Sequence, residues 1–546
     1  MNANLQLNIP SFLNNSFSKF GNKPFLGFSD EKALSYSEVK TQIDNIIYNL
    51  EKIGVKKESK IAILSNNMPN WAIIYFASVS MGAVLVPILP DFSKEEIKNI
   101  LQHSEAKILF VSEVLKNKVE EIETDFLETI YKTNDFSLIR GDIHFNLDKA
   151  YLSSTNYYVD EEDLALLIYT SGTTGQSKGV MLTHKNICFN ARQSGILMPI
   201  FETDKFLSFL PLSHAYENTL GLILPMLNGA SIYYLRKLPT PAVLIPAMQE
   251  VKPSIMLSVP LIIEKIYKNK ILPSFNSKLI TRLIYKIPIF RKILNSVAGR
   301  KLMQQFGGNL RFFGIGGAKL DSVVEKFLIE AKFPYAIGYG LTETSPLVAG
   351  LTPDTIKLNS TGPKIQGIEV KLHDINPKTN QGEIWVKGDS VMKGYYKDIE
   401  ATNQVLTKEG WFKTGDIAKI DKNGYVFIKG RIKNVIIGSS GENIYPEEIE
   451  SVINNFEFVI ESVVLEEKGR LVALVHLNME DVEAKYKNFK EDINLKIEEI
   501  KANLLIYINS KVNKVSAIKT INIQKTPFEK TPTQKIKRYL YSKYQK

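Results

Sequence analysis

One loop near residue 170 has the composition of a phosphate-binding site. It follows an apolar run at 164–169 and combines glycines and hydroxyl residues with one cation, Lys178. Glycine lets the backbone aim successive N–H groups at one point, and hydroxyls and an ammonium add donors for phosphate oxygens. The spacing of Gly172 and Gly175 is too short for the common P-loop. The alternative is a flexible polar linker, but a linker rarely follows a buried strand directly.

Further runs suited to nucleotide chemistry lie in the second half of the chain. Their sequences are FFGIGGAK (312–319), GYGLTETSP (338–346), GWFKTGD (410–416), KGRIK (429–433) and FEKTPTQKIKR (528–538). In this order, together with the loop, they resemble the signature of the adenylate-forming enzymes. That family includes acyl-CoA synthetases, 4-coumarate–CoA ligase, firefly luciferase and the adenylation domains of peptide synthetases. The resemblance extends over nearly the whole chain.

The resemblance implies two half-reactions at one site. A carboxylate attacks the α-phosphate of ATP and expels pyrophosphate, and the thiol of CoA then attacks the acyl-adenylate and releases AMP. The residues that would hold the phosphates are Thr170, Ser171, Gly172, Thr173, Thr174, Gly175 and Lys178. Gly317, Ala318, Tyr339 and Gly340 would lie along the adenine, with Tyr339 stacked on it.

The same resemblance assigns roles to the charged and polar residues of the later runs. Thr342 would bind the α-phosphate, Glu343 a Mg²⁺ ion, and Asp416 both ribose hydroxyls. These residue types suit the roles, because Mg²⁺ commonly uses one or two carboxylates plus substrate phosphates, and a carboxylate accepts two hydrogen bonds at once. The alternative for Glu343 is an exposed side chain in an ordinary loop. Arg431 would lie near the ribose and phosphate.

The C-terminal run has Lys535 where the family has its catalytic lysine. The alternative is a solvated basic tail. Lys433 matches the family's hinge position. Rotation about it would withdraw Lys535 after the first half-reaction and bring Gly441 to line a tunnel for the pantetheine arm of CoA.

His214 follows an apolar strand at 206–210, and two interpretations of it remain. A lone histidine there is usually a satisfied core residue, whereas the resemblance makes it the residue that flanks the acyl carboxylate. Some long-chain members of the family have a tryptophan gate four residues later. Here that position is Asn218, and Tyr216 is the nearest aromatic residue.

The elements that must position these residues alternate between strands and helices. Apolar strands are expected at 60–64, 83–89 and 106–111, and Ser93 with Glu96 forms a capping box that starts a helix. Such alternation indicates a mostly parallel sheet covered by helices. By resemblance, the fold is a large α/β N-terminal domain (1–430) of packed subdomains with a distorted β-barrel. A small, mobile α+β C-terminal domain (431–546) would follow.

The net charge, the cysteine content and the apolar segments of the sequence exclude several classes of protein. The 546 residues carry a net charge of +10, which favours anionic partners such as nucleotides, CoA or acidic lipid, and no nucleic-acid recognition module is visible. One cysteine, Cys188, excludes an internal disulfide framework, suits the cytoplasm and is expected in the core. No signal peptide is visible. The most apolar window, 71–89, is broken by Gly82 and Pro87 and is expected to be buried core.

A basic amphipathic segment occupies 265–301, within a stretch from Glu264 to Asp321 that has no acidic residue in between. Lys278, Arg282 and Lys286 are four apart and share a helix face, with apolar residues beside them and Pro288 as an interruption. One interpretation is a solvated surface helix packed on the domain. The other is a contact with an anionic membrane surface or an acidic ligand.

We expect an AMP-forming long-chain fatty acid–CoA ligase that uses ATP, CoA and Mg²⁺. The runs LSHAYE (212–217) and TPTQKIKR (531–538) look like the prokaryotic long-chain branch. A fatty acyl-AMP ligase or an acyl-carrier-protein ligase would share every motif. An aryl or medium-chain CoA ligase, a peptide-synthetase domain, a luciferase-like oxidase and a non-catalytic binding protein are disfavoured alternatives. Peptide-synthetase domains normally have a pocket aspartate, and the corresponding stretch here is Pro211–His214.

Overall fold

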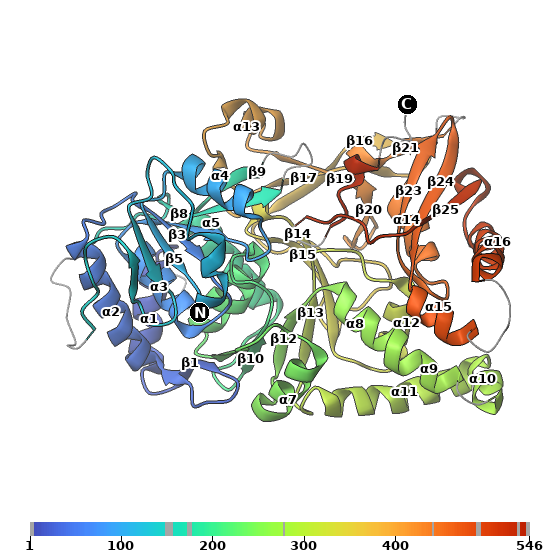
Figure 1. Cartoon of the computed structure of the whole chain (residues 1–546), viewed down its shortest axis with the longest axis horizontal. Coiled ribbons are helices and arrows are strands. Elements are labelled where there is room, and N and C mark those ends of the chain that lie inside the picture. The colour runs from blue at the N-terminus through green and yellow to red at the C-terminus, as the bar shows by residue number, and fades with distance from the viewer. Residues whose placement is uncertain are drawn as a thin grey trace.

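The structure is a computed structural model of the whole chain. It describes residues 5–147, 157–171, 177–276, 279–438, 442–486, 493–531 and 535–541. Two large sheets and their helices form the N-terminal part, and a smaller unit formed by the C-terminal segment lies at the other end of the long axis (Figure 1). The expected fold class, a large α/β domain followed by a small α+β domain, is confirmed.

The first large sheet has the strand order β18-β9-β8-β4-β3-β5-β6-β7. Its strands are β3 (Lys60–Leu64), β4 (Val84–Ile88), β5 (Ile108–Val111), β6 (Thr129–Lys132), β7 (Leu138–Arg140), β8 (Leu164–Ser171), β9 (Ser177–Thr183) and β18 (Gly394–Tyr395). β3, β4 and β5 pair in parallel, as the strand–helix alternation predicted. The Ser93–Glu96 capping box is present at the start of α4 (Lys94–Ser104).

The second large sheet has the order β15-β14-β13-β12-β10-β11-β1-β2. Its strands are β1 (Pro24–Phe28), β2 (Leu34–Ser35), β10 (Lys205–Ser208), β11 (Ser231–Tyr234), β12 (Ile255–Ser258), β13 (Phe312–Ile315), β14 (Tyr335–Gly340) and β15 (Leu347–Gly350). β10 to β14 pair in parallel, so the carboxyl ends of these strands meet at one edge. Site residues expected after β10, β13 and β14 therefore lie at that edge.

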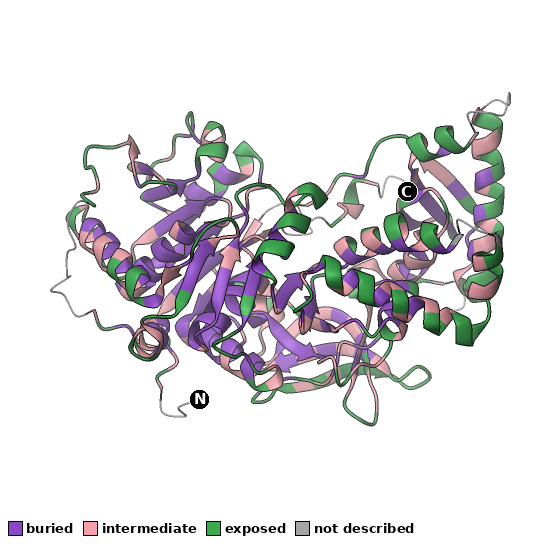
Figure 2. Ribbon diagram, turned by 90° about the horizontal axis from the view of Figure 1, so that it is seen from below, coloured by how far each residue is buried: buried purple, intermediate pink, exposed green. Residues whose placement is uncertain are grey.

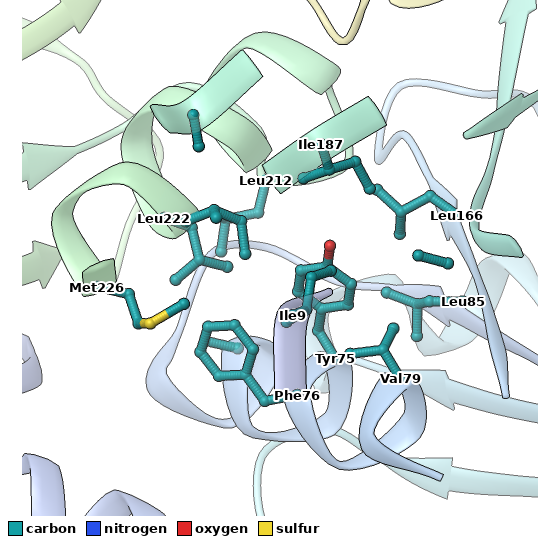
Figure 3. Close-up of a cluster of buried hydrophobic side chains, with 14 of the residues drawn as sticks. Ile9, Tyr75, Phe76, Val79, Leu85, Leu166, Ile187, Leu212, Leu222 and Met226 are labelled. Atoms are coloured by element: carbon teal, nitrogen blue, oxygen red, sulfur yellow. The ribbon is translucent and has the colours of Figure 1, made fainter. Parts of the chain in front are cut away.

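One apolar core joins the two large sheets. Helices α1 (Ile9–Phe20), α2 (Tyr36–Lys52), α3 (Pro69–Ser80), α5 (His184–Leu197) and α6 (Leu224–Leu227), with the π-helical η2 (Glu217–Ile223), contribute side chains to it. Tyr75 and Phe76 lie among apolar side chains from both sheet regions (Figure 3). The apolar window at 71–89 is α3 followed by β4 and is buried as predicted, and Cys188 is buried in α5.

A third, four-stranded antiparallel sheet has the order β16-β17-β19-β20. Its strands are β16 (Glu369–Asn376), β17 (Gln381–Lys387), β19 (Phe412–Ile420) and β20 (Val426–Arg431), and α13 (Ile399–Val405) lies between β18 and β19 in the chain. Bridges at Ala349–Lys364 and Pro363–Tyr425 connect this region with β15.

The C-terminal unit packs a three-stranded sheet, β23 (Val459–Glu467), β24 (Arg470–Leu477) and β25 (Thr520–Gln524), against helices. These helices are α14 (Pro446–Ile453), α15 (Met479–Tyr486) and α16 (Ile493–Lys511), and a two-stranded ribbon of β21 (Ile436–Ile437) and β22 (Asn443–Ile444) precedes them. Residues 487–492, between α15 and α16, lie outside the described residues. We propose the domain boundary at 430/431, where β20 ends.

The remaining helices surround the second large sheet. They are α7 (Pro241–Val251), α8 (Pro260–Ile266), α9 (Leu272–Asn276), α10 (Leu279–Tyr285), α11 (Pro288–Gln305) and α12 (Ser322–Glu330). The break expected at Pro288 separates α10 from α11. Among the described residues, no helix combines the length and apolarity needed to cross a bilayer.

Candidate active site

A cleft of about 2900 Å³ runs between the N-terminal part and the C-terminal unit. All the predicted site residues that the structure describes in full, glycines included, line this one cleft. These residues are Thr170, Lys178, His214, Gly317, Ala318, Tyr339, Gly340, Thr342, Glu343, Asp416, Arg431, Lys433 and Lys535. Gly172, Thr173, Thr174, Gly175 and Gly441 lie outside the described residues, and of Ser171 only the backbone is described, at the end of β8.

The predicted phosphate loop connects two strands of an antiparallel hairpin. β8 and β9 pair with Thr170 opposite Lys178, so these two residues lie side by side at the same end of the two strands. Lys178 points its ammonium at the face of Tyr395, with Nζ 4.8 Å from the ring centroid. This cation–π contact holds the Lys178 ammonium at the cleft, and the aromatic ring does not neutralise its charge as a carboxylate would.

Asp416 is held by residues from two different elements. The Tyr339 hydroxyl donates to Asp416 Oδ2 at 2.7 Å, and Arg431 Nε lies 2.8 Å from Oδ1. Asp416 and Arg431 are directly opposite each other in the β19–β20 register, which explains the ion pair. Burial raises the pKa of Asp416, and the charge of Arg431 opposes this rise. The carboxylate is therefore desolvated yet compensated, as a buried charge must be.

Glycine is required where β14 approaches its neighbour. A Cβ built on Gly340 would lie 1.9 Å from the carbonyl oxygen of Pro346, which excludes any larger residue. Gly317 follows β13 with φ of +84°, a left-handed conformation that favours glycine. Gly340 thus lets β14 pass close to the chain at Pro346, and Gly317 allows the turn after β13.

Glu343 lies in the short helix η4 (Thr342–Thr344) that follows β14. Its Oε1 accepts a hydrogen bond of 2.9 Å from the Tyr395 hydroxyl. The described residues contain no cluster of three or more His, Cys, Asp and Glu side chains that could hold a metal. A Mg²⁺ ion at Glu343 fits the single carboxylate provided that ATP phosphates supply further oxygen ligands, which is the usual arrangement for this ion.

Lys535 reaches this cleft from the C-terminal unit. Two hydrogen bonds to Thr531 hold its backbone, since Thr531 N donates to Lys535 O at 2.7 Å and Lys535 N donates to Thr531 Oγ1 at 3.2 Å. Although Lys535 keeps contact with solvent, desolvation within the cleft lowers its pKa, and the charge of Arg431 adds to this effect. The carboxylates of Asp416 and Glu343 act in the opposite direction.

His214 is neutral at physiological pH. Burial lowers its pKa to about 4, and the charge of Lys535 contributes to the shift. Tyr216 N donates to His214 Nδ1 at 3.3 Å, which leaves the proton of the neutral ring on Nε2. His214 therefore offers one N–H donor and no charge.

A second, apolar cavity of about 60 Å³ lies beside the cleft. Its lining includes Leu197, Met198, Leu220, Leu257 and Ile337 among other apolar residues. Tyr216 lines both spaces, and a Cβ built on Gly314 would lie 2.9 Å from its hydroxyl oxygen. Glu217, next in the chain, is buried, its Oε2 has no hydrogen-bond partner among the described residues, and burial raises its pKa to about 8.

Tyr395 and Glu217 had no role in the sequence interpretation. Tyr395 belongs to the run Gly394–Tyr396, which with GWFKTGD resembles a run of the family, but only the fold shows that Tyr395 contacts Glu343 and Lys178. Glu217 gave no signal, since its burial depends on the packing of η2.

Polar contacts hold the C-terminal unit against the N-terminal part. Lys268 Nζ donates to the carbonyl oxygen of Asn454 at 2.5 Å, and the Asn455 side-chain amide donates to Asp321. These contacts place the C-terminal end of α14 against the start of α12 and against the helical turn Tyr267–Ile271 that follows α8. In this arrangement Lys535 is in the cleft.

The sequence model of a family described as "AMP-binding enzyme" matches residues 13–396, more than half of the chain. Among similar curated proteins, the long-chain-fatty-acid–CoA ligase FadD15 of Mycobacterium bovis is 28% identical over 92% of this chain and 89% of its own. The long-chain-fatty-acid–[acyl-carrier-protein] ligase AEE15 of Arabidopsis thaliana, a chloroplastic protein, is 27% identical over 87% of this chain and 77% of its own.

Solved structures share the fold at low sequence identity. The o-succinylbenzoate CoA synthetase MenE from Bacillus subtilis, in complex with its acyl-adenylate intermediate, superposes with a TM-score of 0.77 at 22% identity and covers 97% of both chains. The same enzyme with ATP and a magnesium ion gives 0.76. ATP-bound MatB from Rhodopseudomonas palustris gives 0.76 at 21% identity and covers 98% of both chains.

Proposed function

Because this chain belongs to the AMP-binding enzyme family and is an adenylate-forming, acyl-activating ligase, we propose that its substrates are a long-chain fatty acid, ATP and CoA. The observation that carries the proposal is the shared cleft. Residues from six separate runs of the sequence line it, and an apolar cavity adjoins it at Tyr216.

In the first half-reaction, the protein contributes mainly by neutralising charge, because displacement at phosphorus depends on positioning and electrostatics. Lys178 and Arg431 would bind phosphate oxygens, and Lys535 would approach the carboxylate and the α-phosphate as pyrophosphate leaves. Asp416 would accept hydrogen bonds from the ribose, and the neutral His214 would donate to the acyl group without adding charge. Glu343 would hold Mg²⁺, which supplies electrostatic stabilisation of the phosphates when bound.

In the second half-reaction, the same adenylate must meet a thiol. Rotation about Lys433 would remove Lys535 from the cleft and present the segment with Gly441 to the pantetheine arm. The contacts of Lys268 with Asn454 and of Asp321 with Asn455 would break in that rotation. They are polar, which suits an interface that must open at every turnover.

The long-chain assignment rests on the apolar cavity and on the run 212–217 at its border. Leu212 is buried, and Tyr216, Gly338 and Leu347 line both the cleft and the cavity, so an acyl chain could pass from the adenylate into apolar surroundings beside the Tyr216 ring. An acyl-carrier-protein ligase or fatty acyl-AMP ligase is the second candidate, favoured by the similarity to AEE15.

A pyrophosphate-release assay over carboxylates from acetate to oleate tests the acid. We expect the highest kcat/KM with long-chain acids. A much higher value with short or aromatic acids would show that the long-chain assignment is wrong. Supplying CoA and holo-acyl carrier protein separately, and identifying the thioester by mass spectrometry, distinguishes the two candidates. Acyl-AMP release with either acceptor would indicate an acyl-AMP ligase.

A further inference from the structure

The outer surface of α10 and α11 is apolar, where a surface helix is usually polar. Helical residues of this pair, with the linker between them, expose large hydrophobic side chains to solvent: Ile280 72%, Leu283 57%, Ile287 47%, Ile289 65%, Phe290 46%, Ile293 56% and Val297 38%. The two helices lie along the lower right border of the molecule (Figure 1), and a view from below shows exposed helical positions in that half (Figure 2). Clustered exposure of this kind usually marks an interaction site.

The exposed residues of α11 do not face the protein core. Its inner side is formed by Asn295, Gly299 and Leu302, which are buried, and a Cβ built on Gly299 would lie 2.3 Å from the carbonyl oxygen of Ala331. Ile289 and Ile293 are four residues apart, as are Ile293 and Val297, so they form one stripe on the opposite side. α11 is therefore apolar on two sides, and only one of them is covered by the described residues.

Cations border the apolar stripe. At 100° per residue, Lys292 falls on one side of the stripe and Lys301 on the other, and both are exposed. Lys286 in the linker and Arg300 of α11 are exposed as well, and Arg282 of α10, also exposed, lines the cleft. No aspartate or glutamate occurs between Glu264 and Asp321 in the sequence.

The acidic residue that packs on α11 does not offset this charge at the surface. Glu330 of α12 lies 2.8 Å from Arg291 and accepts a hydrogen bond of 2.7 Å from Asn295, and its side chain is only 7% exposed. The outward face of α10 and α11 therefore combines exposed hydrophobic residues with uncompensated positive charge.

We propose that this face, formed by the described residues 280–301, docks on an anionic lipid bilayer. The apolar stripe would enter the boundary between headgroups and acyl chains, and the long side chains of Lys292 and Lys301 would extend along it to the lipid phosphates. The charge decides for lipid over an ordinary protein partner, because protein interfaces are depleted in lysine whereas anionic membranes attract it. The proposal does not depend on the acyl substrate of the enzyme.

Co-sedimentation with vesicles tests the proposal. The full-length protein is mixed, at low ionic strength, with vesicles of phosphatidylcholine and phosphatidylglycerol, and in parallel with phosphatidylcholine alone. We expect sedimentation with the anionic vesicles only, weakened by added salt. Failure of the wild-type protein to sediment with anionic vesicles overturns the proposal.

A double substitution of two apolar residues tests whether α11 makes the contact with the bilayer. Ile289→Ser/Ile293→Ser should lower the partition coefficient at least about tenfold, since each substitution removes apolar carbon atoms from the lipid boundary and adds a hydroxyl group. Ile399→Ser/Ile506→Ser is the matched control, because these residues are 70% and 69% exposed on other helices. Equal losses in both pairs would refute the assignment.

A charge pair tests the electrostatic part. Lys292→Glu/Lys301→Glu should lower the partition coefficient at least about 20-fold, since each cation near anionic lipid contributes roughly fivefold in binding. Lys98→Glu/Lys422→Glu makes the same change in net charge at exposed sites elsewhere and should have a small effect. Far-ultraviolet circular dichroism and the thermal midpoint establish that every variant is folded.

The alternative to lipid is that this face binds a second copy of the chain. Sedimentation equilibrium of the wild type and of Ile289→Ser/Ile293→Ser measures self-association directly. A dimer that this pair abolishes, in a protein that does not sediment with anionic vesicles, would assign the face to a protein–protein contact and overturn the lipid proposal.

Discussion

The hydroxyl of Tyr339 donates a hydrogen bond of 2.7 Å to Asp416, which joins the end of β14 to β19 across the candidate nucleotide site. Asp416 also pairs with Arg431, so each of its oxygens has a partner. If Asp416 accepts the ribose hydroxyls, as proposed, its carboxylate must stay in one orientation while it is buried. Tyr339 is therefore expected to have two functions, an aromatic face for the adenine and a hydroxyl that orients Asp416.

Tyr339→Phe separates these two functions. The ring remains, but the carboxylate of Asp416 loses a donor, and losing a hydrogen bond to a charged group typically costs about 1.5–3 kcal/mol. We expect KM for ATP to rise about tenfold or more with a smaller change in kcat. Steady-state kinetics with varied ATP at saturating acid measures this. An unchanged KM for ATP would mean that Arg431 alone orients Asp416.

Glu343 is expected to bind Mg²⁺ with one carboxylate. Glu343→Gln keeps the size of the side chain and an acceptor for the Tyr395 hydroxyl but removes the charge. We expect a large loss of pyrophosphate release and a higher Mg²⁺ requirement, with an unchanged thermal midpoint. Tyr395→Phe is the control, since it removes only the hydrogen bond. An active Glu343→Gln enzyme with normal Mg²⁺ dependence would place the metal elsewhere.

Part of this architecture could be predicted from residues alone. The strand at 60–64, the capping box at Ser93 and the strand end before His214 follow from local patterns, and these appear where expected. Contacts between distant segments could not be predicted. Tyr395 meets Glu343 because β18 pairs with β9, and no local property of either residue encodes that pairing. Likewise, the basic character of 265–301 is visible in sequence, but which side of α11 is covered depends on α12.

Tyr216 lines both the cleft and the apolar cavity, and we expect it to set the acyl chains that the enzyme accepts. Tyr216→Ala removes the ring between the two spaces. We expect kcat/KM for the longest acids to rise relative to that for medium-chain acids, because more of the chain can be buried at about 25 cal/mol per Å². Competition between two acids in one reaction, with the products quantified by mass spectrometry, measures the ratio. An unchanged ratio would exclude Tyr216 as the gate.

Glu217 is expected to make stability depend on pH. Its folded-state pKa is about 8, above the ordinary value for glutamate, so its contribution to stability is complete below about pH 4.5 and is lost as the pH rises through 8. Glu217→Gln cannot ionise and should lose nothing over that range. The difference in unfolding free energy, variant minus wild type, should therefore increase between pH 5.5 and pH 8.5 by a few kcal/mol. Urea titrations of both proteins measure it, and identical pH profiles would contradict the effect of burial on this carboxyl group.

Lys535 is expected to serve only the first half-reaction. It lies beyond Lys433 in the chain and reaches the cleft in the arrangement in which Asn455 contacts Asp321. Its ammonium would offset charge on the carboxylate and the α-phosphate, and loss of one such preorganised group typically costs about 10²–10³ in rate, or about 3–4 kcal/mol. Lys535→Ala should therefore fail to release pyrophosphate from acid and ATP.

The same Lys535→Ala variant should still convert synthetic acyl-adenylate and CoA to acyl-CoA, because that step needs the other domain orientation, from which Lys535 is absent. Lys537→Ala is the matched control, since Lys537 lines the same cleft two residues later. Rates of the two half-reactions, measured separately by pyrophosphate release and by thioester formation, decide the matter. Equal loss in both halves would indicate a structural role for Lys535. No loss in either half, combined with loss in Lys537→Ala, would transfer the catalytic role to Lys537.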